Sequence, residues 1–296
     1  MNKIFIPLAC AVGLVSCSAK ANEQSTEQQT LNQDLATTMN ETTGTPAVTS
    51  DKKVIINTSE GEIEVLLYGD TPKHQANFIK LAKEDYYNGT LFHRVINEFM
   101  VQAGDPDSKT AGAGAHLGSG GPGYQIDAEF VYPKHFHKYG ALAAARTGDQ
   151  MNPERKSSGS QFYIVTGKKY SDAELKQIEE HLKNAPLQQK FYELATKHQA
   201  EIMKMQRDGD HAGLQKLQEE LIAQAEAAVG NVGGLTDAQR EAYKTIGGTP
   251  HLDGQYTVFG EVVKGMDVVE KIQKAETDSY DRPVKDIKIL SMKVEE

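Results

Sequence analysis

Two apolar runs near the start of the regular part of the chain set the first pattern. The runs 54–58 and 62–67 are rich in Val and Ile, and Ser59-Glu60-Gly61 separates them. Such runs around a short turn that contains Gly predict a β-hairpin. Thr71-Pro72 then has the form of a helix start with Pro in the first turn. Asn88-Gly89 is a typical helix end, so the pattern predicts strand, strand and helix in that order.

Strand-like runs recur along the rest of the chain, in two groups with a long gap between them. They cover 91–96, 99–103, 141–145, 161–165, 256–262 and 287–292. A second helix is predicted at 265–274. Many short strands with two helices at separated positions favour an antiparallel sheet that closes on itself. The predicted fold class is therefore mainly β, an antiparallel closed barrel capped by two helices.

Residues 168–247 have a different pattern, because their apolar positions recur at helical spacing. Helical stripes are predicted at 175–182, 187–205, 214–225 and 236–245. Arg207-Asp208-Gly209-Asp210 interrupts them between the second and the third. Short turns between helices make neighbours antiparallel. We expect a helical hairpin or small bundle inserted in one barrel loop, with stripes that serve packing rather than cofactor binding.

The first residues have the design of a secretory signal peptide. Lys3 precedes an apolar run at 4–15 that is too short to span a bilayer. The run ends in Leu14-Val15-Ser16-Cys17, which resembles the lipobox of bacterial lipoproteins. In those proteins, cleavage before the Cys leaves that residue to carry the lipid. A plain signal peptide cut near Ala19 or Ala21 is the alternative.

The next segment is rich in Ser, Thr, Gln, Asn and Glu, with almost no large apolar residues. It cannot bury enough surface to offset its ordering entropy, so we expect a flexible tether. A helix at 24–39 is the alternative. The predicted organisation is a signal peptide at 1–16, lipidated Cys17 with the tether at 17–50, a first barrel part at 51–167, a helical insertion at 168–247, and a second barrel part at 248–296.

Composition narrows the function classes. The net charge is -9 and Lys and Arg form no dense block, so nucleic-acid binding is not expected. Cys10 lies in the run to be removed, which leaves Cys17 as the one cysteine of the predicted mature chain. No internal disulfide can then form, and packing alone has to hold the fold.

The most informative stretch is 92–105, Phe-His-Arg-Val-Ile-Asn-Glu-Phe-Met-Val-Gln-Ala-Gly-Asp. Its pattern predicts two short strands across a turn at Asn97-Glu98. Because side chains alternate on a strand, Met100 and Gln102 share one face. On pattern alone, Arg94 is as consistent with a surface residue of a barrel strand as with a functional residue.

Three segments in the same order resemble the signatures of the cyclophilins. They are 92–105, Ser158-Gly159-Ser160-Gln161-Phe162-Tyr163-Ile164 and Leu252-Asp253-Gly254-Gln255-Tyr256-Thr257-Val258-Phe259-Gly260. The resemblance covers about 53–167 and 248–294, and leaves out the insertion, the tether and the signal peptide. It implies a cyclophilin-like eight-stranded antiparallel barrel closed by two helices, and cis–trans isomerisation of peptidyl-prolyl bonds.

The resemblance also implies roles for individual residues. Arg94 corresponds to the family's catalytic arginine, and Gln102 to the glutamine beside it. Positions that line the proline pocket are Phe99, Met100, Tyr163 and Leu252. Further substrate contacts are expected at Ala145, Arg146, Thr147, Gln161, His251 and Tyr256.

Some of these positions depart from the family's usual residues. His251 stands where the family often has a tryptophan that contacts cyclosporin, so we expect weakened inhibition with isomerase activity retained. Tyr256 replaces a frequent His, Arg146 a frequent Asn, and Tyr163 a frequent Phe. None of these changes removes a proposed catalytic group, but we expect those at Tyr256 and Arg146 to alter substrate preference.

No metal or cofactor is expected. His135 and His137 have strand spacing and His93 is next to Arg94, but no Cys or acidic cluster offers further ligands at metal-binding spacing. The segment 118–123 superficially resembles a phosphate loop. It lacks the Lys-Ser/Thr pair of such loops, so we interpret it as a turn that flanks the substrate.

The sequence therefore predicts a peptidyl-prolyl cis–trans isomerase that assists the folding of exported proteins. Its expected partners are proline-containing polypeptide clients, and we expect a monomer in the cell envelope, lipid-anchored to a bacterial membrane at its periplasmic face or at the cell surface. The alternative is a chaperone or client-binding module that uses the helical insertion, with incidental isomerase activity. A third reading makes the insertion a lid over the pocket.

Overall fold

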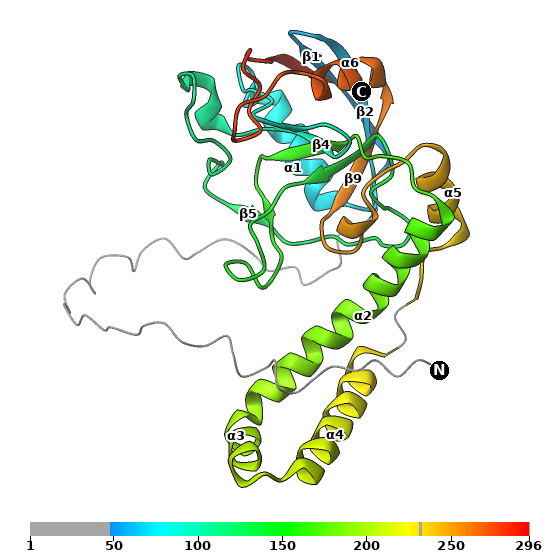
Figure 1. Cartoon of the computed structure of the whole chain (residues 1–296). Coiled ribbons are helices and arrows are strands. Elements are labelled where there is room, and N and C mark those ends of the chain that lie inside the picture. Colours follow the sequence, from blue (N-terminus) through cyan, green and yellow to red (C-terminus); the bar gives the residue numbers. More distant parts are fainter. Residues whose placement is uncertain (1–47, 231–232, 296) are drawn as a thin grey trace, which may run out of the picture. The chain divides into compact units, whose positions relative to one another are not determined.

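The computed structural model describes residues 48–230 and 233–295. The predicted signal peptide, Cys17 and most of the predicted tether lie outside these residues. The described chain divides into two compact units (Figure 1), one built from 48–178 with 235–295 and the other within 179–234.

An eight-stranded antiparallel sheet organises the first unit. Its order is β10-β1-β2-β9-β6-β8-β4-β3. The strands in that order are β10 (Ile289–Val294), β1 (Lys52–Thr58), β2 (Gly61–Leu67), β9 (Val258–Lys264), β6 (Ala141–Ala144), β8 (Phe162–Val165), β4 (Met100–Ala103) and β3 (Arg94–Ile96). Two shorter strands, β5 (Gln125–Ile126) and β7 (Ser157–Ser158), form a separate pair. The first strands of the chain therefore lie beside the last ones (Figure 1).

The first hairpin shows how the sequence specifies this sheet. Buried and partly exposed residues alternate along β1 and β2, as the Val and Ile pattern predicts. At the turn, the Thr58 hydroxyl accepts hydrogen bonds from the amides of Glu60 and Gly61, both at 3.1 Å. Gly61 has φ +143°, and a Cβ there would lie 2.7 Å from the Val268 side chain. The turn therefore requires glycine at this position.

The prediction of a closed barrel is wrong, because the sheet is open between β10 and β3. Within the described residues, this side is spanned by one isolated bridge, Leu91 to Lys288, and by single bonds such as Val95 N–H to the Asp281 carbonyl at 2.8 Å. β3 has three residues, and the segment that faces it is irregular rather than a strand. A continuous ladder therefore does not form there.

Two helices pack on the sheet, as predicted. They are α1 (Pro72–Lys83) and α6 (Met266–Gln273), and α1 ends several residues before the predicted Asn88-Gly89. Phe78 of α1 contacts the ring of Phe162 edge-on at 5.3 Å, inside the same core as the buried residues of α6. Burial of each large apolar side chain contributes about 1.5–3 kcal/mol, so packing of this kind can hold the unit without a disulfide.

Helices fill the region where the sequence predicts an insertion. α2 (Asp172–Lys197) contains the first predicted stripe and the first part of the second, whose end lies in α3 (Gln199–Asp208). α4 (His211–Val229) follows. Gly209, at φ +68°, ends α3 inside the predicted break. The second unit has its own small core, formed by Leu187, Phe191, Ala195, Ile202, Leu217, Leu221 and Ala225.

The last predicted helix belongs to the first unit. It is α5 (Asp237–Thr245), and Thr236 with Gln239 forms a capping box at its start. Because the helices together contain more residues than the strands, the prediction of a mainly β protein is wrong. The physical reason is the insertion, since α2, α3 and α4 are among the longest elements of the described chain.

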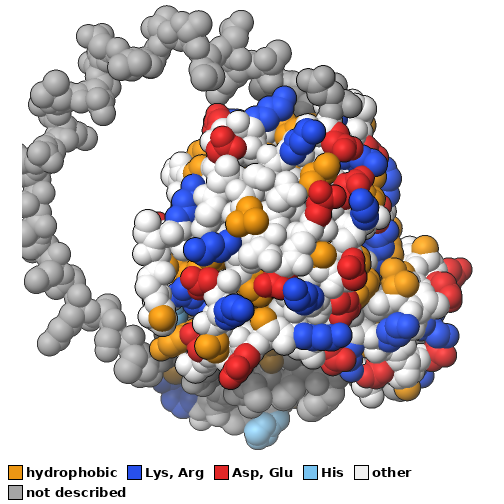
Figure 2. All heavy atoms as spheres, turned by 90° about the horizontal axis from the view of Figure 1, so that it is seen from above, with side chains coloured by type: hydrophobic (Ala, Val, Ile, Leu, Met, Phe, Trp, Pro, Cys, Tyr) orange, Lys and Arg blue, Asp and Glu red, His pale blue; other side chains and the backbone are white. Residues whose placement is uncertain are grey.

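The surface carries charges of both signs. Figure 2 shows one face of the molecule, on which Lys and Arg side chains are interspersed with Asp and Glu. None of the helices in the described part of the chain is long and apolar enough to cross a membrane.

Candidate active site

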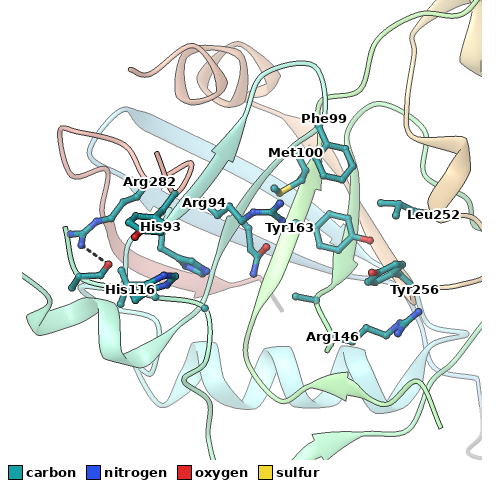
Figure 3. Close-up of a pocket in the computed structure, with 16 residues that line it drawn as sticks. His93, Arg94, Phe99, Met100, His116, Arg146, Tyr163, Leu252, Tyr256 and Arg282 are labelled. Atoms are coloured by element: carbon teal, nitrogen blue, oxygen red, sulfur yellow. Dashed lines mark hydrogen bonds between the residues drawn. The ribbon is translucent and has the colours of Figure 1, made fainter. Parts of the chain in front are cut away.

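A cavity of about 380 Å³ lies at the end of the sheet where β3, β4 and β8 are neighbours. These strands supply Arg94, Met100, Gln102 and Tyr163 to its wall, and loops supply the rest. Figure 3 shows Arg94 between two groups of side chains, an apolar group around Tyr163 and a second group around His93.

Apolar and aromatic side chains form one end of the cavity. They are Phe99, Met100, Tyr163, Leu252 and Tyr256. Met100 is 2% and Tyr163 4% exposed. The rings of Tyr163 and Tyr256 meet edge to face with centroids 6.0 Å apart, a favourable geometry for aromatic pairs. Burial raises the pKa of Tyr163, which keeps its hydroxyl protonated. This end therefore offers a surface of low polarity.

A chain of polar side chains borders the apolar end. Arg94 and Gln102 are paired across β3 and β4. Gln102 donates from Nε2 to Gln161 Oε1 at 2.9 Å, and Gln161 donates from Nε2 to the Gly120 carbonyl at 2.7 Å. Arg94 Nε lies 3.6 Å from Asp281 Oδ2, with the two side chains 43% and 45% exposed. Exposed pairs of this kind are weak, so the guanidinium stays available to a ligand.

Arg146 is held differently from Arg94. Its Nε donates to the Gln255 carbonyl at 2.8 Å and its Nη1 to Asp149 Oδ1 at 2.6 Å, with the side chain 3% exposed. Its guanidinium also lies over the ring of Tyr256, 4.4 Å from the centroid. The charge of Arg146 is therefore already partnered, and this side chain supports the aromatic wall.

The opposite end of the cavity contains two histidines. His93 is 4% exposed, and within the described residues neither of its ring nitrogens has a hydrogen-bond partner. Burial lowers the pKa of His93, which favours the neutral ring. The ring of His116 packs against that of Tyr280 with centroids 4.4 Å apart. In the part of the chain that the structure describes, no group of three or more His, Cys, Asp or Glu could hold a metal ion.

Comparison with known proteins decides the family. Residues 53–178 and 227–294 match the family model of the cyclophilin type peptidyl-prolyl cis-trans isomerases. The chain belongs to the cyclophilins. The resemblance drawn from the three sequence motifs is thereby confirmed, and peptidyl-prolyl cis–trans isomerisation is the activity of this family.

Curated relatives agree with the family model over most of this cyclophilin. A Staphylococcus epidermidis protein assigned to the peptidyl-prolyl cis-trans isomerases is 31% identical over 245 residues, which is 82% of this chain and 92% of the relative. A Staphylococcus aureus relative is 30% identical over the same shares of the two chains. The crystal structure of a Cryptosporidium parvum cyclophilin covers 83% of this chain and 98% of its own, with 19% identity and a TM-score of 0.48.

The structure brings most of the predicted site residues of this cyclophilin to one place. The first cavity is lined by Arg94, Phe99, Met100, Gln102, Ala145, Arg146, Tyr163, Leu252 and Tyr256. Thr147 and Gln161 line a second cavity of about 500 Å³, which shares Gln102, Ala145 and Arg146 with the first.

His251 is the predicted site residue that the structure places differently. It is not among the lining residues of either cavity, and its ring stacks on Phe99 with centroids 5.6 Å apart. Burial lowers the pKa of His251. The His251 ring therefore packs against Phe99, which itself lines the first cavity.

Sequence reasoning missed one end of the cavity. Its lining there consists of His93, Ala115, His116, Leu117, Gly118, Tyr280 and Arg282. Most of these residues lie in two irregular loops that have no hydrophobic period to interpret. Two features of the sequence could have pointed to this end of the cavity. His93 directly precedes Arg94, and the glycine-rich loop is predicted to flank the substrate. That loop supplies Gly118 to both cavities.

Proposed function

We propose that this cyclophilin catalyses rotation about X–Pro bonds of exported polypeptides in the first cavity, with the proline ring against the apolar end. The observation that carries the proposal is the position of Arg94. Its weakly paired guanidinium lines the same cavity as the buried side chains of Met100 and Tyr163. A bound prolyl ring would thus place its amide within reach of the arginine.

The chemistry of the reaction explains why this pair of surfaces is suitable. The peptide bond crosses a barrier of about 18–20 kcal/mol when it rotates, because twisting removes amide resonance. Without a catalyst this takes tens to hundreds of seconds, on the order of a slow folding step. The twisted amide has lost charge separation, and its nitrogen has regained a lone pair. An apolar surface therefore favours the twisted amide over the planar one.

Arg94 supplies the electrostatic part of this mechanism. The guanidinium donates to the lone pair of the prolyl nitrogen or holds the carbonyl oxygen of the rotating bond. Either contact strengthens in the transition state, which is the condition for acceleration. The bond from Gln102 to Gln161 orients the Gln102 amide and directs its Oε1 to accept a backbone N–H of the client. The mechanism needs no covalent step and no cofactor.

The substitution Arg94→Ala tests this assignment. Loss of a single transition-state donor should lower kcat by about 10²–10³-fold. The rate is measured as cis–trans exchange of a tetrapeptide with one X–Pro bond, by NMR exchange spectroscopy. The matched control is Arg207→Ala on α3, an exposed arginine that lines neither cavity. A kcat for Arg94→Ala equal to that of the control would remove Arg94 from the mechanism.

We propose further that the enzyme is exported and anchored through lipidated Cys17. It then meets its clients outside the cytoplasm. Lys3, the apolar run at 4–15 and the Leu14–Cys17 sequence support this. Mass spectrometry of the mature N-terminal peptide should find an acylated Cys17 as its first residue. The variant Cys17→Ala should release the protein from the membrane fraction. An unmodified Cys17, or a mature chain that begins elsewhere, would contradict the proposal.

A further inference from the structure

A buried carboxylate lies next to the apolar end of the cavity. Asp253 follows the cavity residue Leu252 in the chain, and its side chain is 1% exposed. Its oxygens accept from the amide and Nδ1 of His137 at 2.8 and 3.0 Å, the hydroxyl of Tyr243 at 2.6 Å and Nε2 of Gln239 at 3.3 Å. A buried carboxylate with its oxygens satisfied in this way is a rigid point in a fold.

The bond to Asp253 also determines which nitrogen of His137 carries a proton. A carboxylate oxygen only accepts, so Nδ1 of His137 must be the donor. The other ring nitrogen, Nε2, lies 3.0 Å from the hydroxyl of Tyr163, within hydrogen-bond distance. A hydroxyl both donates and accepts, so Tyr163 can bond to this nitrogen whichever of the two atoms carries the proton. Two hydrogen bonds therefore connect Tyr163 to Asp253 through His137.

This chain of bonds ends on a side chain that lines the cavity. Tyr163 lies in β8 between β4 and β6, and its ring also meets Tyr256 edge to face. The family often has Phe at this position, which has no hydroxyl. The hydroxyl of Tyr163 allows residues outside the sheet to hold the ring through a hydrogen bond. His137, Asp253 and Tyr243 provide that anchor, and none of them lines the cavity.

The far end of the chain lies on α5. Tyr243 is fully buried in the first unit, where its ring packs against Phe136 and its backbone carbonyl accepts from Tyr170 N–H at 3.0 Å. The helix that follows the insertion in the chain is thus connected to a wall of the cavity by three consecutive hydrogen bonds. No other helix of the described chain has such a connection to Tyr163.

We propose that Tyr243 and His137 are positioning residues for prolyl binding. They act through Asp253 and the Tyr163 hydroxyl, and they set the place of the Tyr163 ring in the cavity wall. The inference rests on the proposed function, because it assigns this wall to the proline ring. The prolyl ring keeps its shape while its amide twists, so its contact with the Tyr163 ring is equal in both states, and the low polarity that favours the twisted amide does not depend on that contact. The position of the Tyr163 ring therefore governs KM and leaves kcat unchanged.

The first test is Tyr243→Phe, which removes one donor to Asp253 and keeps the ring. KM for an X–Pro tetrapeptide should rise about two- to tenfold at unchanged kcat, the range expected for one net hydrogen bond. The matched control is Tyr170→Phe, since Tyr170 packs edge-on against Tyr243 but gives no hydrogen bond to Asp253. Lower thermal stability of Tyr243→Phe with an unchanged KM would reduce Tyr243 to a structural role and overturn the inference.

A double-mutant cycle tests the route. In a Tyr163→Phe background the hydroxyl at the end of the chain is gone, so Tyr243→Phe should change KM by less than about 1.5-fold. An equal rise in KM in both backgrounds would mean that Tyr243 does not act through Tyr163. Equilibrium titration of each variant with an Ala-Pro peptide gives an affinity that does not depend on the rate of isomerisation. The cycle can therefore fail while Arg94→Ala still lowers kcat, and it can succeed while Arg94→Ala has no effect. This inference and the proposed function are thus separately testable.

Discussion

The two walls of the cavity differ in how their side chains are held. On the apolar wall, Tyr163 is held by His137 and Asp253, whose side chains have almost no contact with solvent. On the polar wall, Arg94 lies 3.6 Å from Asp281, and both side chains are nearly half exposed. The two walls have different tasks. An apolar surface contributes through its shape, and dense buried hydrogen bonding preserves a shape. A catalytic charge must turn toward the substrate, and a weak exposed partner leaves it free to do so.

Removal of the buried carboxylate should have the largest effect. Asp253→Ala leaves the donors on His137, Tyr243 and Gln239 without their acceptor in a buried site. We expect the free energy of unfolding to fall by about 3–5 kcal/mol, measured by urea denaturation followed by circular dichroism.

The matched control for Asp253→Ala is an exposed ion pair. Asp172 is 73% exposed and pairs with Lys244 at 2.8 Å. Asp172→Ala should cost no more than about 1 kcal/mol of unfolding free energy. If the two variants lost the same small amount, the buried bonds would not distinguish the apolar wall from the surface.

The smallest effect is expected on the polar wall. Asp281 has φ +60°, a conformation that Asn also tolerates, so Asp281→Asn removes the charge and preserves the backbone. With its partner neutral, Arg94 should bind the rotating amide more readily. We expect kcat/KM to rise by at most about fivefold at low ionic strength, the range of an exposed pair.

Salt provides the check on Asp281→Asn. The gain should disappear at about 1 M salt, because the interaction between exposed charges is then screened. Asp267→Asn on α6, which is exposed, makes the same change in net charge and should leave kcat/KM unaffected at both ionic strengths. A gain that persists at high salt would show that Asp281 restrains Arg94 by something other than charge.

Local pattern predicted the elements well where one face of the chain is buried. Alternation in β1 and β2 and the helical stripes of α2 to α4 follow directly from which side chains meet the two cores. The family motifs then identified Arg94, Met100 and Tyr163, which come together because β3, β4 and β8 are neighbours. Closure of the barrel was not predictable in this way, since it depends on whether an irregular loop pairs with the three residues of β3.

The support of Tyr163 could not be found from the sequence either. His137 was considered only as a metal ligand, and Tyr243 only as part of a helical stripe. Their function in the fold depends on contacts between β8, α5 and the segment after Leu252, which no periodicity connects. The role of a buried polar group depends on its hydrogen-bond partners, and here those partners are distant in sequence.

The place where the chain leaves the helical unit has a consequence for the evolution of this cyclophilin. Gly234 lies against Glu179, and a Cβ on Gly234 would come within 2.9 Å of the Glu179 carboxylate. The side chain at the beginning of the segment 179–234 thus reaches the residue at its end. Because the entropy of closing such a loop grows only slowly with its length, descendants can lengthen, shorten or exchange this segment without changing the sheet. Lineages can diversify there while the catalytic framework stays under separate selection.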